Sequence, residues 1–420
     1  MHYSLRVLLI LGVLLISACS SDSGPGSDPV PDSGSDDSPK NLSFQLLDST
    51  EQPVSGVTVI MHGADNVSIE ETRVSDVDGV ADFGEVDNRK VTITVYSPFT
   101  TGYAYLATYV DIDPGETTLY VEVDHEQPSC FYTFYEAFDE NGSISMNYLI
   151  TVGGASGGGA STPFLGAGGT TCADVQNDGN ISAIAFKNSP SIYGMSIDQA
   201  PFWDAQNVDE ARMSILLQYE PASLTFSGLG AQITYFRLSA IHKGVKYPIN
   251  NPDKTGPSSI AYADQFPAEY YIVNTSFGGS GRTMVMDALY SHIDVPLVDI
   301  QFFDYGYNTA ENLVYWNHSG TTEVNLQTLY IQTGQSSGVQ LWYVHLPSSS
   351  TQWKMPDLPA DVLNAIGGRN NIPYDIRIRG WNIENENYDT AVLVNNRQRF
   401  RGVVTHSSAY ADRAIPVPRP

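Results

Sequence analysis

The sequence predicts an all-β protein, with a small N-terminal β-sandwich followed by one or two larger antiparallel β domains. Apolar and polar residues alternate along many segments; in 374–379, for example, Tyr374, Ile376 and Ile378 alternate with charged side chains. Such alternation gives a strand one apolar and one polar face. Thr, Val and Tyr, which favour strands, are frequent, and turn residues recur roughly every eight to twelve positions.

Turn and cap signals define individual elements. Asn141-Gly142 lies between the segments 131–138 and 143–152 and predicts a type I′ hairpin. Asp178-Gly179 makes a similar break before a strand at 181–186. A single short helix is expected at 359–366, because Pro359 opens it and Gly367-Gly368 follows it.

The first nineteen residues form a targeting segment. Arg6 precedes an apolar run that starts at Val7, and the segment ends in Ile16-Ser17-Ala18-Cys19. The apolar run is about half the ~20 residues that a membrane-spanning helix needs. The segment resembles a bacterial lipoprotein signal peptide with its lipobox. The resemblance implies removal of residues 1–18, lipid (palmitate) attachment at Cys19, and, because Ser20 replaces the Asp of inner-membrane retention, the outer membrane. An ordinary secretory signal cleaved after Ala18 remains an alternative.

Residues 19–40 are expected to form a disordered tether. From residue 20 onward they are Ser, Asp, Gly and Pro apart from Val30 and Lys40. Such a composition buries too little apolar surface to offset the entropy of ordering the chain.

Residues 41–125 are expected to fold as the small sandwich. The stretches 48–58 and 76–83, followed by the alternating Val91 to Val95, resemble the carboxypeptidase regulatory-like domain, which has a transthyretin-like or immunoglobulin-like fold. The resemblance implies a noncatalytic spacer, with no active-site residues to carry over. Within it, Asp78-Gly79 is expected to supply a corner with positive φ. Residues 126–420 resemble no family and would form the large β region, with a candidate seam near residue 295.

Charge excludes one class of partner. The chain has 21 Lys and Arg against 47 Asp and Glu, a formal net charge of −26. Binding of nucleic acid is not expected, because it needs a basic surface. The lipid is the expected contact with the membrane, and an envelope protein or a polysaccharide is the expected soluble partner.

Two cysteines remain after Cys19. Cys130 and Cys172 are expected to form one disulfide, which is the simplest use of a lone pair in an oxidising compartment. Two free buried thiols or a metal site are the alternatives, although no Cys-x-x-Cys motif and no His near Cys172 favour zinc.

Catalytic and metal signals are sparse. Gly154-Ala155-Ser156-Gly157-Gly158 matches a nucleophile elbow in letters, but no helix is expected after it. No cofactor is expected beyond a structural Ca²⁺, for which Asp174, Asn177 and Asp178 are candidates and ordinary turn chemistry is the alternative. Paired acids, Asp139 with Glu140 and Glu384 with Glu386, could flank a glycosidic bond, although solvated turns explain them as well.

Aromatic residues give the candidate ligand-binding surface. Trp316, Trp353 and Trp381 lie in a C-terminal half rich in Tyr, Asn and Gln, a combination on which sugar rings stack. The alternative is that these aromatics fill sandwich cores. The sequence therefore favours a noncatalytic, lipid-anchored envelope protein for adhesion or protein interaction. A carbohydrate-binding lipoprotein is the second hypothesis, and an enzyme of an unrecognised family is the third.

Overall fold

The computed structural model describes residues 38–98, 104–123, 130–138, 140–141, 148–152, 167–172, 181–187, 191–199, 202–204, 207–228, 235–250, 259–333, 340–366, 373, 375–401 and 404–417. Within these residues there are 28 strands and two helices. The predicted all-β class is confirmed. Cys19 and the rest of 1–37 lie outside the described residues, as do Asp139, the Gly-rich run around Ser156, and Asp174, Asn177 and Asp178.

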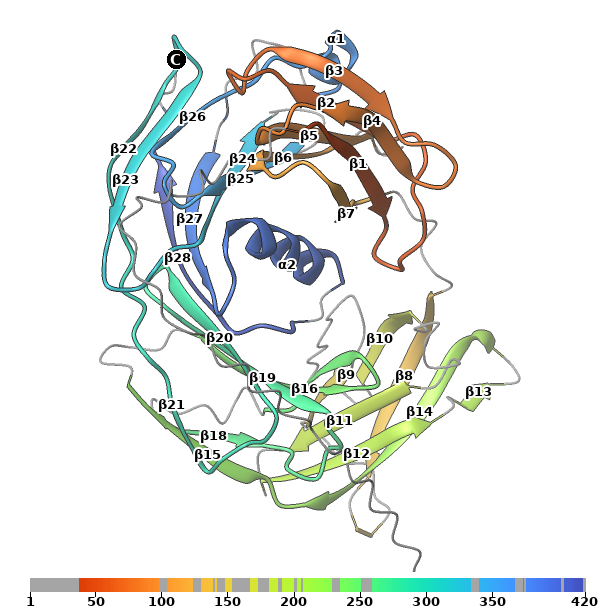
Figure 1. Ribbon diagram of the computed structural model, residues 1–420. Coiled ribbons are helices and arrows are strands. Elements are labelled where there is room, and N and C mark those ends of the chain that lie inside the picture. The colour runs from red at the N-terminus through yellow and green to blue at the C-terminus, as the bar shows by residue number, and fades with distance from the viewer. Residues whose placement is uncertain are drawn as a thin grey trace, which may run out of the picture. The chain divides into compact units, whose positions relative to one another are not determined.

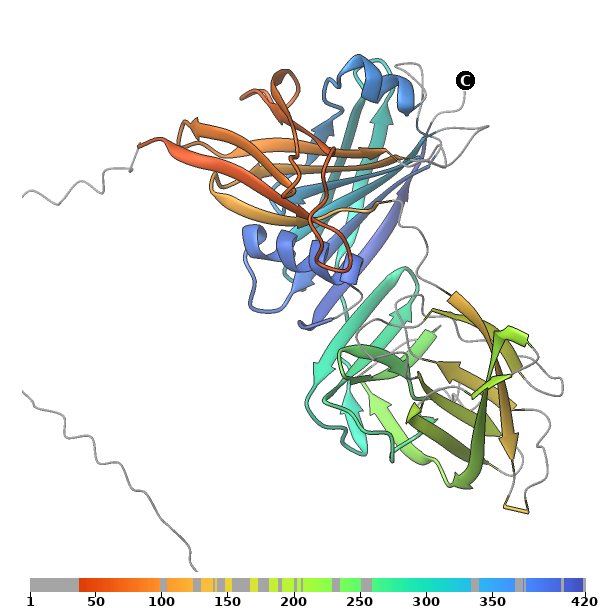
Figure 2. The same ribbon diagram turned by 90° about the vertical axis from the view of Figure 1, so that its right-hand side faces the viewer.

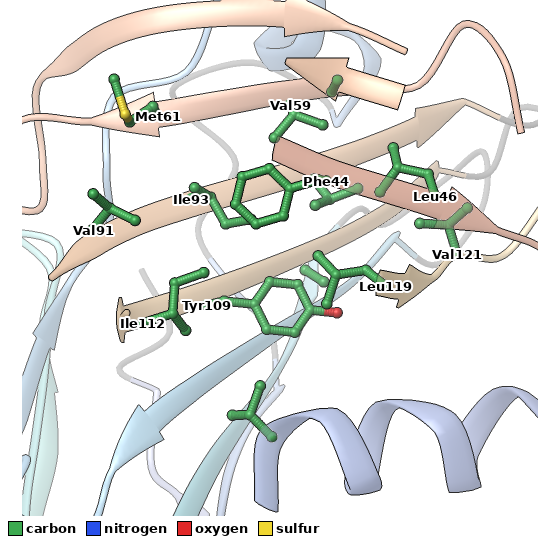
Figure 3. Close-up of a cluster of buried hydrophobic side chains, with 14 of the residues drawn as sticks. Phe44, Leu46, Val59, Met61, Val91, Ile93, Tyr109, Ile112, Leu119 and Val121 are labelled. Atoms are coloured by element: carbon green, nitrogen blue, oxygen red, sulfur yellow. The ribbon is translucent and has the colours of Figure 1, made fainter. Parts of the chain in front are cut away.

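The N-terminal strands form two sheets that face each other. The strands are β1 (Lys40–Leu47), β2 (Thr58–His62), β3 (Ile69–Val74), β4 (Val80–Val86), β5 (Val91–Pro98), β6 (Ala104–Ile112) and β7 (Glu116–Tyr120). One sheet has the order β4-β1-β7, and the other begins β3-β2-β5-β6. Side chains from both sheets meet between them, among them Phe44, Val59, Ile93 and Leu119 (Figure 3).

The second of these sheets continues into the C-terminal part of the chain. Strand β6 pairs in parallel with β25 (Gln340–Pro347), with Tyr105 opposite Leu341 and Tyr109 opposite His345. The twelve-stranded sheet has the order β17-β16-β19-β20-β28-β27-β24-β25-β6-β5-β2-β3 (Figure 1). Its further strands are β16 (Tyr235–His242), β17 (Val245–Pro248), β19 (Tyr270–Phe277), β20 (Ser280–Met286), β24 (Leu326–Thr333), β27 (Asp375–Ile383) and β28 (Ser408–Ile415).

Three smaller sheets complete the β structure. A seven-stranded sheet contains β8 (Cys130–Phe138), β9 (Tyr148–Val152), β10 (Ala167–Cys172), β11 (Ile181–Lys187), β12 (Ile192–Gln199), β13 (Phe202–Asp204) and β14 (Asn207–Tyr219). Two three-stranded sheets contain β15 (Ala222–Ser227), β18 (Ser259–Tyr262) and β21 (His292–Asp294), and β22 (Gln301–Asn308), β23 (Leu313–Ser319) and β26 (Gln352–Lys354).

Three hydrophobic cores lie against the twelve-stranded sheet. The first joins the N-terminal strands to Leu326, Ile383, Ala391 and Val392. The second lies between the sheet and the β22-β23-β26 layer, and the third packs β16 and β19 against the β15-β18-β21 layer. Strands β5 and β6 are consequently buried along almost their whole length. Residues before and after position 125 thus share one sheet and one core, while the domain boundaries named above stay predictions.

One of the two helices was predicted from the sequence and the other was not. Helix α1 (Ala360–Ala365) follows Pro359 as predicted. Helix α2 (Tyr388–Arg401) was not predicted; it packs Ala391 and Val392 into the first core beside β7 and β24 (Figure 2). Its start carries a cap, since Asn387 Oδ1 accepts a hydrogen bond from the Thr390 N–H (3.1 Å). Neither described helix is long and apolar enough to cross a bilayer.

The local β predictions had mixed outcomes. In β27, Ile376 and Ile378 are fully buried while Arg377 is exposed, as the alternation predicts. Gly79 has φ +77°, as its turn requires. The hairpin predicted at Asn141-Gly142 is wrong, because β8 pairs with β10 and β14 whereas β9 pairs with β11. The turn signal is local, but pairing partners are selected by contacts across the whole sheet.

Candidate functional site

Two of the three tryptophans proposed as a ligand-binding surface are core residues. Trp316 is 1% exposed, and its indole N–H donates to Gln327. Trp353 is 5% exposed and packs edge-on against Trp342, with ring centroids 5.3 Å apart. Neither ring offers a face to a sugar, so the core alternative is the correct one for both.

Trp381 belongs to a cluster on the opposite face of the sheet. Its ring lies against Tyr410 with centroids 5.1 Å apart. The Arg379 guanidinium lies over the rings of Tyr410 (4.5 Å), Tyr330 (5.0 Å) and Trp381 (5.2 Å). It also donates to Asp412 at 3.1 Å. The protein's own cation therefore fills this aromatic cluster, as a ligand cation does in an aromatic cage.

A polar pocket of about 280 Å³ adjoins the cluster at Tyr410. Its walls come mainly from β16, β17, β19, β20 and β28. The lining residues are Tyr235, Arg237, Lys246, Asn274, Thr275, Ser276, Arg282, Thr283 and Tyr410. The volume lies near the lower end of the roughly 300–1,000 Å³ typical of small-molecule sites.

The strand register explains why these side chains meet. Arg237, Asn274, Thr283 and Ser408 lie directly opposite one another along a row across four strands. The neighbouring row on the same face contains Tyr235, Ser276, Gly281 and Tyr410. Directly opposite side chains in antiparallel pairs are about 5 Å apart, so each row is a continuous line of contacts.

Gly281 leaves space in the second row because it has no side chain. A Cβ at Gly281 would come within 2.6 Å of the Tyr410 ring. The ring therefore lies directly over the glycine backbone, where any other residue would displace it. Local sequence patterns could not identify this role of Gly281, because it depends on Tyr410, which is 129 positions further along the chain.

The pocket is cationic in an acidic protein. Among the described residues, its lining contains Arg237, Lys246 and Arg282 and no carboxylate. Arg282 is held by Glu384 at 3.5 Å, whereas within the described residues no acid pairs with Arg237 or Lys246. Burial lowers the pKa of Lys246, and the nearby positive charge of Arg237 lowers it further.

Several polar clusters resemble catalytic groups without their geometry. The Ser227 hydroxyl lies 2.9 Å from His292 Nε2 and donates to Asp294 (3.0 Å), so serine stands between the base and the acid. In a nucleophilic triad the histidine occupies that middle position. Asp198 similarly lies between Ser182 and His242.

The acidic pair Glu384 and Glu386 has structural partners. Glu384 pairs with Arg282, and Glu386 pairs with His406 at 3.1 Å. Within the described ranges no group of three or more His, Cys, Asp or Glu residues could hold a metal ion. Cys130 and Cys172 lie opposite each other in the β8–β10 pair.

Comparisons with known proteins add little. No protein-family model matches the chain, and no curated protein matches it. Among solved structures, the chain is similar to the shaft pilin SpaA from Lactobacillus rhamnosus GG, at 10% identity over 43% of this chain and 98% of the pilin chain, with a TM-score of 0.15. A similarity of this size supports no functional argument.

Proposed function

We propose that this chain is a noncatalytic, lipid-anchored protein of the bacterial outer membrane that binds a partner or ligand at the pocket on β16, β19, β20 and β28. The observation that carries the proposal is the pocket itself, an open polar hollow whose two side-chain rows are built by four neighbouring strands. Its described lining offers charged, polar and aromatic side chains suited to contacts with a ligand, and these favour binding as its function.

The pocket favours carbohydrate over a flat protein surface as ligand. Tyr235, which is 48% exposed, supplies a ring face, Tyr410 forms part of the wall, and Asn274 and Thr283 supply polar groups. This combination suits a small polar ring. A protein that adheres by binding polysaccharide would agree with both leading hypotheses from the sequence, adhesion and carbohydrate binding.

Affinity electrophoresis of the full chain tests this function. Gels that contain bacterial or algal polysaccharides should retard the protein, and Tyr235→Ala should abolish the retardation. Tyr290→Ala removes another exposed tyrosine, 66% exposed and outside the pocket, and should leave it unchanged. Equal retardation of both variants would refute the pocket as the binding site.

We propose Cys19 as the lipid attachment point, on the strength of the lipobox-like segment before it. Labelling with radioactive palmitate in a bacterial host should mark the chain, and Cys19→Ala should remove the label. Cys130→Ala serves as the matched control and should keep it. Label that persists in Cys19→Ala would disprove this anchor.

We propose a disulfide between Cys130 and Cys172. The register supports it, because directly opposite residues of an antiparallel pair have Cα atoms about 4.5–5.5 Å apart, within the range that disulfides span. The intact mass of the exported chain should rise by two hydrogens on reduction. An unchanged mass would remove the bridge.

We also propose that 41–125 is a carboxypeptidase regulatory-like spacer. Support comes from the two facing sheets of β1 to β7 and from the positive φ of Gly79.

A further inference from the structure

Arg237 and Lys246 line the same pocket, and no acid of the described residues forms an ion pair with either of them. Arg237 and Ile241 point to the same face of β16, because they are an even number of positions apart. Lys246 lies opposite Ile241 in the β16–β17 hairpin, so both cations belong to the pocket face. The effect of Arg237 on the Lys246 pKa indicates that the two charges interact.

Such an arrangement costs free energy unless an anion is present. Like charges repel, and burial removes water that would solvate them. Acids outnumber bases by more than two to one in this chain, yet none of the described residues that line the pocket is an acid. The pocket therefore differs in charge from the protein around it.

Neutral groups beside the cations are suited to donate hydrogen bonds. Thr283 Oγ1 donates to Asn274 Oδ1 at 2.8 Å, which directs the remaining hydrogen-bonding capacity of Asn274 to its Nδ2 donor. Ammonium, guanidinium and amide donors together match the acceptor oxygens of a carboxylate, sulfate or phosphate.

We propose that the pocket binds a small ligand through an oxyanion group, held by Arg237 and Lys246 with Asn274 beside them and the Tyr235 and Tyr410 rings as walls. This proposal rests on the proposed function of the pocket as a ligand site. It specifies in addition that the ligand is negatively charged. The ring walls favour an oxyanion carried on a sugar, as in a uronic acid, over a free inorganic ion.

Isothermal titration calorimetry of the full chain in a neutral detergent tests the proposal. The probes are glucuronate, its neutral counterpart glucose, sodium sulfate and inorganic phosphate. Glucuronate should bind, and its Kd should rise with salt because the attraction is electrostatic. Arg237→Gln and Lys246→Gln should each raise that Kd about tenfold or more, as expected for loss of a hydrogen bond to a charged group.

Three further variants distinguish the effect of pocket charge from the effect of pocket shape and from a general effect of substitution. Lys246→Arg keeps the charge and should retain binding, whereas Gly281→Ala keeps all charges but displaces the Tyr410 ring and should weaken it. Lys354→Gln removes one exposed positive charge from β26, outside the pocket, and should bind like the wild type.

The outcomes distinguish this proposal from the one on which it rests. Tighter binding of glucuronate than of glucose, lost in Arg237→Gln and Lys246→Gln, supports both. Binding of sulfate or phosphate with no binding of glucuronate supports the oxyanion site and rejects a sugar as its carrier. Equal binding of glucose and glucuronate, unaffected by the two substitutions, overturns the oxyanion proposal and leaves a neutral ligand site. No binding of any probe, together with no retardation on polysaccharide gels, overturns both.

Discussion

Asn396 joins helix α2 to the N-terminal sandwich through one buried side chain. It is 2% exposed; its Oδ1 accepts from the Tyr120 N–H (2.7 Å), and its Nδ2 donates to the Tyr120 carbonyl (3.0 Å) and the Tyr109 hydroxyl (2.9 Å). The bonds to Tyr120 span 276 positions and the bond to Tyr109 spans 287. The amide thus satisfies both backbone groups of Tyr120 away from water.

Removing this amide should destabilise the protein. Asn396→Ala leaves the two backbone groups of Tyr120 without partners, and we expect a loss of about 2–4 kcal/mol in the free energy of unfolding. Urea denaturation followed by circular dichroism measures it. Asn395→Ala, the same change at the neighbouring, less buried position, should cost less than about 0.5 kcal/mol. Equal losses in the two variants would contradict this role.

His345 makes stability depend on pH. Its imidazole is buried, stacks on Tyr109 at 5.0 Å and lies near Arg399; burial, and then the arginine charge, lower its pKa to about 3. The folded state therefore keeps His345 neutral while the unfolded chain takes up a proton near pH 6.5. Its contribution is fully present above pH 6.5 and is lost progressively as the pH falls toward 3.

Substitution of His345 should reduce this dependence. Between pH 6.5 and 5 the wild type should lose about 2 kcal/mol through this group, an upper bound from one proton taken up on unfolding. Burial lowers the pKa of His62 and His318 too, so part of the dependence should remain in His345→Gln. Urea titrations at several pH values measure it, with exposed His292→Gln as the control. An unchanged pH slope in His345→Gln would rule out the buried neutral imidazole.

At the scale of the element, two glycines allow the cost of backbone strain to be measured separately from the cost of a steric clash. Gly79, just before β4, has φ +77°, and Gly84, inside β4 where its register with β1 shifts, has φ +72°. A Cβ at Gly79 would meet the Leu46 carbonyl oxygen at 2.6 Å, whereas one at Gly84 would meet nothing within 4 Å. Gly84→Ala should therefore cost about 1 kcal/mol of strain, and Gly79→Ala clearly more. Thermal melts of both variants check this, and equal Tm values would contradict it.

Elements differ in how far local sequence determines them. The alternation in β27 and the turn at Gly79 depend on neighbours in sequence, and both were predictable. Strand β8 pairs in parallel with β14, whose paired residues lie 78 positions further along the chain, so the local Asn141-Gly142 signal did not predict its partner. Helix α2 has a weakly amphipathic sequence, although the Asn387–Thr390 cap and Asp389 in its first turn were signals for its start. The pocket combines Arg237, Asn274 and Tyr410, which only the strand register brings together.

At the scale of the molecule, the N-terminal sandwich depends on the C-terminal strands. Strand β6 has β25 as a neighbour, and the first core includes Leu326, Ile383 and Val392. A fragment of residues 38–125 would expose one edge of β6 and part of this core. We expect such a fragment to bind the dye ANS and to unfold without a sharp transition, whereas the full chain should unfold cooperatively. A sharp transition of the isolated fragment would instead establish the boundary near 125 as that of an independent domain.

The parallel pairing of β6 with β25 also affects the time course of folding. The Trp342 indole N–H donates to Thr108, a bond that spans 234 residues. At a synthesis rate of about 5–20 residues per second, the partner of β6 leaves the ribosome roughly ten to fifty seconds after β6 itself. During that interval the apolar edge of β6 has no partner strand. Contacts between residues so far apart in sequence form slowly even when both partners are present. Chaperones that hold nascent chains should therefore be needed most by the segment around β6, although it is synthesised long before its partner strand.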